Sequence, residues 1–197
     1  RPVLAEIQAL VTRTNFNVPR RTADGFDFNR ANLMLAVLEK RGGVNIGMSD
    51  AYVNVIGGLQ LDEPAADLAL VLAAASSFRD KPIDPSTAAI GEVGLTGEIR
   101  AVTGLQQRLT EAARTGFKTC IIPRHGTANL TAPDGVELLR VRNIREAIRA
   151  YQLGEVYAQN MGVHLRAFRT ALILLSSVLS ACVTAFAGPI SFVGIAV

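Results

Sequence analysis

The sequence predicts an α/β (α+β) domain, with one mixed sheet covered by helices on one or both faces, followed by an apolar helical tail. Over residues 1–152, short runs typical of strands alternate with segments of helical periodicity. Residues 153–197 differ in composition, since they hold only two of the chain's 20 Lys and Arg residues and one of its 17 Asp and Glu residues. We therefore expect two parts that join near Gln152, the first long enough for one domain.

Six runs in the first part have the composition and alternation of strands. We expect strands over Val3–Val11, Ala51–Ile56, Ala88–Val93, Glu98–Val102, Phe117–Pro123 and Val136–Val141. Only a short turn with a glycine separates Ala88–Val93 from Glu98–Val102, which predicts a hairpin. The segments Thr12–Thr22 and Lys81–Ser86 are rich in Asn or Pro, and we expect loops there.

Four segments have the features of helices. Phe28–Arg41 places its apolar residues on one face, Asp27 is a suitable N-cap, and two glycines follow. A second helix is expected to begin at Pro64, after two carboxylates that suit the positive end of the helix dipole, and to run to about Ser77. The other two are expected over Gln107–Thr115 and Ile144–Tyr151.

Composition excludes little by itself. The formal net charge is +3, which does not by itself indicate a nucleic-acid partner. The two cysteines, Cys120 and Cys182, are far apart and predict neither a disulfide framework nor a metal site. No signal peptide opens the sequence at Arg1, and we expect a cytoplasmic protein with a further part upstream.

Two segments carry a resemblance to a known family. Asp62–Asp67 (DEPAAD) and Gly91–Pro123 (GEVGLTGEIRAVTGLQQRLTEAARTGFKTCIIP) resemble the proteolytic domain of Lon-type proteases, a fold of the ribosomal protein S5 domain 2-like type. The resemblance places the serine and the lysine of that family's catalytic dyad at Ala65 and Gln106. Alanine offers no nucleophile and glutamine cannot act as a base, so we expect no catalytic residues here.

Further segments resemble the Lon-like C-terminal domain of the RadA (Sms) family of bacterial DNA repair proteins. They are RPVLAEIQALV, GFDFNRANLMLAVLEKRGG and DAYVNVIGG, within residues 1–152. The resemblance implies a scaffold domain of an ATPase that forms hexameric rings, binds single-stranded or branched DNA and drives branch migration. The ATP, magnesium and zinc sites of that family lie upstream, and neither GK[ST] nor CxxC occurs here, so we expect no cofactor in this chain.

Several basic residues are candidates for contacts with DNA phosphates. We predict such contacts for Arg20, Arg21, Arg30, Lys40, Arg41 and Arg108. The Arg20-Arg21 pair, in a loop without acidic neighbours, is the first choice and Arg30 the second. The alternative is that these residues form solvated charged faces, because Glu39 and Glu111 share helices with several of the basic residues.

The tail resembles a different family. No residue in 170–197 is charged, and the apolar run before Gly188-Pro189 predicts either a membrane span with Arg166 and Arg169 at its cytoplasmic end or a buried helix. Residues 153–197 resemble part of the FecCD-type permeases, which import siderophore iron or vitamin B12. A membrane component of such a transporter is therefore the alternative function. A hydrolase that uses Ser76 or Ser77 is a third possibility.

Overall fold

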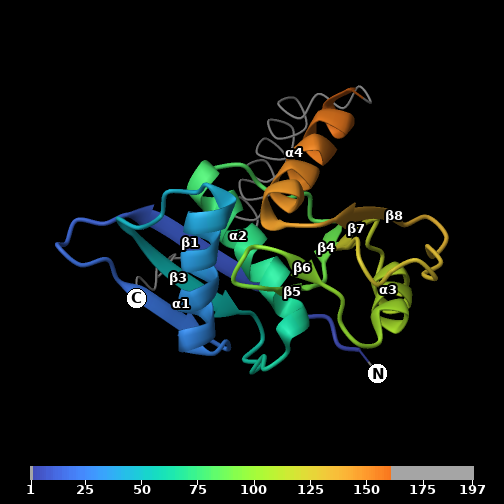
Figure 1. Cartoon of the computed structure of the whole chain (residues 1–197), viewed down its shortest axis with the longest axis horizontal. Coiled ribbons are helices and arrows are strands. Elements are labelled where there is room, and N and C mark those ends of the chain that lie inside the picture. The colour runs from blue at the N-terminus through green and yellow to red at the C-terminus, as the bar shows by residue number, and fades with distance from the viewer. Residues whose placement is uncertain (1, 161–197) are drawn as a thin grey trace, which may run out of the picture. The chain divides into compact units, whose positions relative to one another are not determined.

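The structure, a computed structural model, describes residues 2–160, with side chains as far as Gln152. Residues 1–155 form one compact unit, which contains both sheets and the first three helices (Figure 1). No helix within residues 2–160 is long and apolar enough to cross a membrane. The apolar helical tail and the membrane span expected from the sequence lie outside the described residues.

The first sheet contains three strands in the order β1-β3-β2. They are β1 (Ile7–Arg13), β2 (Arg21–Asp24) and β3 (Ser49–Val55), with β1 antiparallel and β2 parallel to β3. Two helices, α1 (Phe28–Val37) and α2 (Asp67–Arg79), pack against this sheet (Figure 1). Strand β2 lies where the sequence indicated the end of a loop, because it is a short edge strand with little hydrophobic alternation.

The second sheet is fully parallel, in the order β4-β7-β8, and a separate hairpin stands beside it. The strands are β4 (Thr87–Ala89), β7 (Thr119–Pro123) and β8 (Glu137–Val141), and the hairpin pairs β5 (Glu92–Val93) with β6 (Ile99–Arg100). The α+β class is confirmed, but the prediction of one mixed sheet is wrong. The expected strand Ala88–Val93 is interrupted at Gly91, whose N–H bonds to the Ala65 carbonyl, and the chain leaves the sheet there.

The remaining helical segments follow the sequence closely. Asp27 caps α1, which continues as the π-helical turn η1 (Leu38–Gly42) and ends at Gly43 in a left-handed conformation, φ +70°. A 3-10 turn, η2 (Pro64–Ala66), precedes α2. Helix α3 (Leu105–Arg114) covers the second sheet, and α4 (Ile144–Asn160) follows β8.

The domain contains two hydrophobic clusters, and the larger one includes residues of both three-stranded sheets. The larger cluster joins the first sheet to α1 and α2, with Leu38, Leu68 and Leu70 fully enclosed. The smaller cluster joins the second sheet to α3 and includes Leu109 and Cys120. Burial raises the pKa of the Cys120 thiol to about 11, so this cysteine packs as an apolar residue rather than reacting as a thiolate.

A partly buried ion pair connects the helices of the larger cluster to each other, and its carboxylate also binds the hairpin. Asp67 at the start of α2 is fully buried, and its two carboxylate oxygens accept hydrogen bonds from Nε and Nη2 of Arg30 on α1, at 2.6 and 2.5 Å. The backbone N–H of Val93 in β5 donates a third bond, at 3.1 Å. One carboxylate thus fixes α1, α2 and β5 relative to each other.

We expect Asp67→Ala to lower the free energy of unfolding by about 2–4 kcal/mol, since it leaves a partly buried guanidinium and a buried N–H without their acceptor. Urea denaturation followed by circular dichroism measures the change. The matched control is Arg100→Ala, which removes an exposed pair with Glu98 and should change stability by less than about 0.5 kcal/mol. Equal effects of the two substitutions would contradict the proposed role of Asp67.

Candidate functional site

Ala65 lies in the turn η2 and is buried against the rest of the domain. Its N–H donates a hydrogen bond to Oε1 of Glu63 at 3.3 Å, and its carbonyl accepts one from Gly91 at 3.0 Å. The side chain is a methyl group, so the position that the resemblance assigns to a serine has no hydroxyl. The N–H that a helix start could offer to an anionic intermediate is occupied by the chain's own carboxylate.

Gln106, at the position that the resemblance assigns to the lysine, is bonded to a loop. Its Nε2 donates to the carbonyl of Thr131 at 3.0 Å, and its Oε1 accepts from the Thr131 N–H at 3.0 Å. The side-chain amide thus binds both backbone groups of one residue, and the two bonds hold α3 to the segment before β8. Gln106 is thereby a structural residue in this fold.

Arg108, rather than Gln106, connects α3 with the turn that carries Ala65. Its Nη2 lies 2.9 Å from Oε2 of Glu63, and its Nε donates to the carbonyl of Thr103 at 3.1 Å. The hydrogen bond from Arg108 is the main cause that lowers the pKa of the Glu63 carboxyl below its ordinary value, with a further contribution from the Ala65 N–H. An ion pair therefore stands beside the two positions that the resemblance assigns to the dyad.

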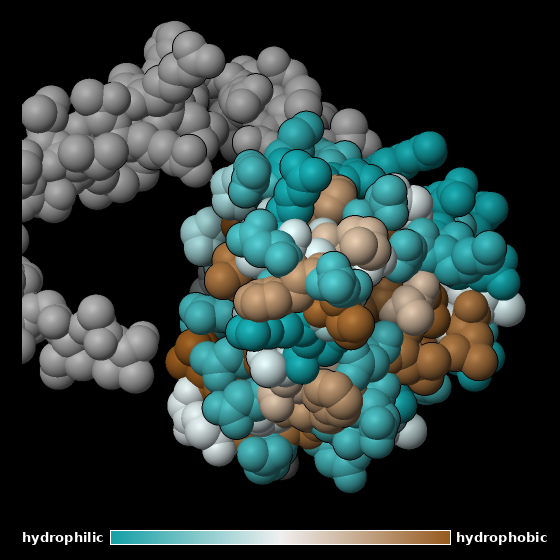
Figure 2. All heavy atoms as spheres, turned by 90° about the vertical axis from the view of Figure 1, so that its left-hand side faces the viewer, coloured by the Kyte–Doolittle hydropathy of each residue, from teal (hydrophilic) through white to brown (hydrophobic). Residues whose placement is uncertain are grey.

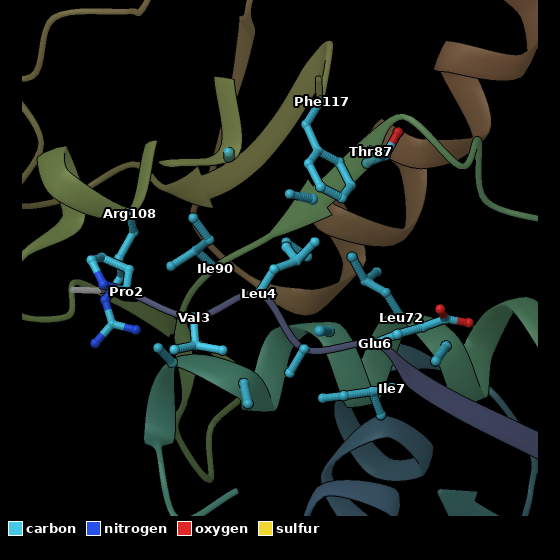
Figure 3. Close-up of a pocket in the computed structure, with 18 of the residues that line it drawn as sticks. Pro2, Val3, Leu4, Glu6, Ile7, Leu72, Thr87, Ile90, Arg108 and Phe117 are labelled. Atoms are coloured by element: carbon cyan, nitrogen blue, oxygen red, sulfur yellow. The ribbon is translucent and has the colours of Figure 1, made fainter. Parts of the chain in front are cut away.

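A groove of about 490 Å³ extends from this ion pair. Its walls are mostly apolar and include Ala65, Leu72, Ile90 and Phe117. The N-terminal segment Pro2–Ile7 runs along it, with Ile90 and Phe117 to one side and Arg108 near Pro2 (Figure 3). Among the residues that the structure describes, the lining includes Thr87 but no Ser, Cys, His or Lys.

Ser76 and Ser77 do not line this groove. The Ser77 hydroxyl accepts a hydrogen bond from the Val11 N–H at 2.9 Å, which ties α2 to β1. The Ser76 hydroxyl donates to the carbonyl of Lys81 at 2.6 Å, after the end of α2. Both hydroxyls thus have partners in the backbone.

The structure does not bring the six predicted DNA contacts together. Arg30 and Arg108 form ion pairs with carboxylates of Asp67 and Glu63, respectively. Arg21 is partly buried and donates to the Ile46 carbonyl at 2.8 Å, and burial is the main cause that lowers its pKa. Arg20 is exposed, and its guanidinium lies 3.9 Å from the centre of the Phe16 ring. Contacts of these residues with DNA stay predictions.

Lys40 and Arg41 are exposed on η1, where two arginines that the sequence analysis did not select lie close to them. Nε of Arg145, in the first turn of α4, donates to the Arg41 carbonyl at 2.7 Å. The carbonyl of Arg142 accepts from Ile99 in the hairpin. We call Lys40, Arg41, Arg142 and Arg145 the basic cluster; all four are exposed.

None of the four side chains forms an ion pair with a carboxylate in the described part of the chain. The run Arg140–Arg149 holds four arginines and a single acid, and this density was the available sequence signal. The backbone of the hairpin turn lies close to Arg41. Gly97 in the hairpin turn has φ +85°, and a Cβ there would lie 2.7 Å from Cβ of Arg41.

Comparison with known proteins agrees with this architecture. Residues 47–159 match the model of the Lon protease (S16) C-terminal proteolytic domain, and the chain belongs to this family. The chain is 54% identical over 149 residues to the DNA repair protein RadA of Bacillus subtilis (strain 168) and 48% identical over 149 residues to that of Streptococcus pneumoniae. These alignments cover 76% of this chain but only 32% and 36% of the two relatives.

The chain therefore spans about a third of the length of these relatives. The resemblance to RadA proteins found in the sequence is confirmed. Residues 138–197 also match the FecCD transport family, in agreement with the resemblance of the tail. The two family matches overlap over residues 138–159, which include most of β8 and of α4.

We expect Arg108→Ala to raise the pKa of the Glu63 carboxyl toward 4.5, since the main cause of its lowering is then gone. In the unchanged protein the folded-state pKa is depressed. The stability that Glu63 contributes is therefore complete above pH 4.5 and is lost as the pH falls through the lower folded value. NMR titration of the Glu63 carboxyl carbon measures the shift.

The control is Arg114→Ala, which removes an exposed arginine of the same helix that pairs with Glu111 instead. This substitution should leave the pKa of the Glu63 carboxyl unchanged. A Glu63 pKa that stays low without Arg108 would contradict the assignment of the ion pair as its cause.

Proposed function

We propose that this chain is a non-proteolytic Lon-type domain that serves as a scaffold in a RadA-type DNA repair protein. The observation that carries the proposal is that Ala65 and Gln106 stand at the positions that the Lon resemblance assigns to the serine and the lysine, in a domain whose relatives are named DNA repair proteins. Peptide hydrolysis by this type of site needs a nucleophile and a base within hydrogen-bond reach. Glu63 and Arg108 instead form an ion pair beside Ala65.

The absence of proteolysis can be tested with casein as substrate. We expect no hydrolysis by the unchanged chain, and none by Ala65→Ser, because a serine without a neighbouring base is not activated. Fluorescence of labelled casein fragments is the measurement. Digestion by the unchanged chain that disappears in Ser76→Ala or Ser77→Ala would favour the hydrolase interpretation instead.

We further propose that the domain contacts DNA through the basic cluster and Arg20. All five residues are exposed, and their ammonium or guanidinium groups can each neutralise a phosphate. Arg30 and Arg108 have lower priority, since releasing them would cost their ion pairs with Asp67 and Glu63. Contacts of this type position the nucleic acid and do not depend on base sequence.

We expect the double variant Arg142→Ala/Arg145→Ala to weaken DNA binding. The slope of log affinity against log salt concentration should fall by about 1 for each phosphate that the variant no longer neutralises. Fluorescence anisotropy with a labelled oligonucleotide over a salt series measures both. The matched control, Arg100→Ala/Arg114→Ala, removes the same charge from exposed arginines that pair with carboxylates. An unchanged salt slope in the first variant would remove the basic cluster from the interface.

Assembly and domain organisation complete the proposal. We infer that residues 1–152 support a hexameric ring in the cytoplasm during branch migration, and that residues 153–197 have a separate, permease-related origin. The match of residues 138–197 to the FecCD family supports the second point. Sedimentation of the chain tests the ring, and a monomer would argue against it. Genomic sequence across the codons for Tyr151–Gly154 tests the junction.

A further inference from the structure

The loop between β1 and β2 is anchored at both ends and free at its tip. At its start, the Thr14 N–H donates to the Met48 carbonyl at 3.3 Å. At its end, the Arg20 N–H donates to Oδ1 of Asp50 at 2.7 Å, and the Arg20 carbonyl accepts from the Ala51 N–H at 2.9 Å. The loop projects from the edge of the domain beside the first sheet (Figure 1). Its two ends are held by these hydrogen bonds, whereas its tip is exposed to solvent.

The tip presents an aromatic ring to solvent. Phe16 remains 50% exposed, although the guanidinium of Arg20 lies over its ring at 3.9 Å. Val18 and Met48 are also exposed, at 75% and 64%. The side of the molecule that carries this loop mixes hydrophobic with hydrophilic residues (Figure 2). The loop and the residue that anchors its start thus offer three exposed apolar side chains to a ligand.

Arginines are the charged residues of the loop itself. Between Glu6 and Asp24 the sequence holds Arg13, Arg20 and Arg21 but no acidic residue. Asp50, which reaches the loop from β3, is buried and bonded to the Arg20 N–H. An exposed aromatic ring in contact with an exposed arginine matches an unpaired nucleotide, which offers a base to stack and a phosphate to neutralise.

We propose that Phe16 is a stacking platform for an unpaired base and that Arg20 contacts a phosphate of the same strand. The proposal rests on the DNA-binding function proposed above and names the kind of DNA that this loop takes. A base in a duplex has both faces covered by its neighbours, so a protruding ring can stack only where the strand is single. The Phe16–Arg20 contact holds the ring in place before DNA arrives, which limits the ordering cost of binding.

The test compares single-stranded with double-stranded DNA on the full chain. With a labelled oligothymidine of about 30 nucleotides, Phe16→Ala should weaken binding at least about fivefold, since base–aromatic stacking is worth this much or more. Binding to a blunt duplex of the same length should not change. Phe28→Ala is the matched control, because Phe28 is 49% exposed at the start of α1, and it should leave both affinities unchanged.

A second variant reports stacking directly. The chain contains no tryptophan, so Phe16→Trp introduces a single indole at the loop tip. We expect oligothymidine to quench its fluorescence and to leave the fluorescence of Phe28→Trp unchanged. Both phenylalanines are half exposed, and the urea midpoints of these variants should equal that of the unchanged chain.

Four outcomes would overturn the proposal. Equal weakening of single-strand and duplex binding in Phe16→Ala, or no weakening of either while the unchanged chain binds DNA, removes the stacking role and leaves the proposed function intact. A change in sedimentation without a change in DNA affinity would make the loop a contact between subunits. Failure of the unchanged chain to bind either DNA at low salt would contradict both the proposed DNA-binding function and this proposal.

Discussion

The arrangement of this domain depends on the burial of one carboxylate. Asp67 has no access to water and is held by the forked guanidinium of Arg30 and by the Val93 N–H. A charge in that position is tolerated only if every acceptor oxygen has a donor, so α1, α2 and the hairpin must meet where they do. The turn η2 immediately precedes Asp67, and its position, with that of Ala65, follows from the same constraint.

The polar groups beside this groove are engaged in contacts within the fold. In the proposed scaffold role, Glu63 and Arg108 connect η2 to α3, and Gln106 connects α3 to the loop at Thr131. The pair of Glu63 and Arg108 thereby links the turn before α2 to α3, a helix of the smaller cluster.

Much of this architecture follows from local sequence patterns. Helical periodicity with Asp27 as a cap located α1, and the DEPAAD segment located η2 and the start of α2. Strand β2 and the division into separate sheets escaped prediction. A four-residue edge strand has too little alternation to be recognised, and the break at Gly91 depends on a hydrogen bond to Ala65, 26 residues earlier in the sequence. Sheet membership is a property of such long-range bonds.

The sequence by itself determined most of the elements and the family that the domain resembles. Only the tertiary structure decided which basic residues are free to meet a ligand. Arg30 pairs with Asp67, 37 residues away, and Arg145 reaches the carbonyl of Arg41 across 104 residues. The sequence shows where each arginine is. Whether its guanidinium can bind a ligand depends on the partners that folding brings within hydrogen-bond distance.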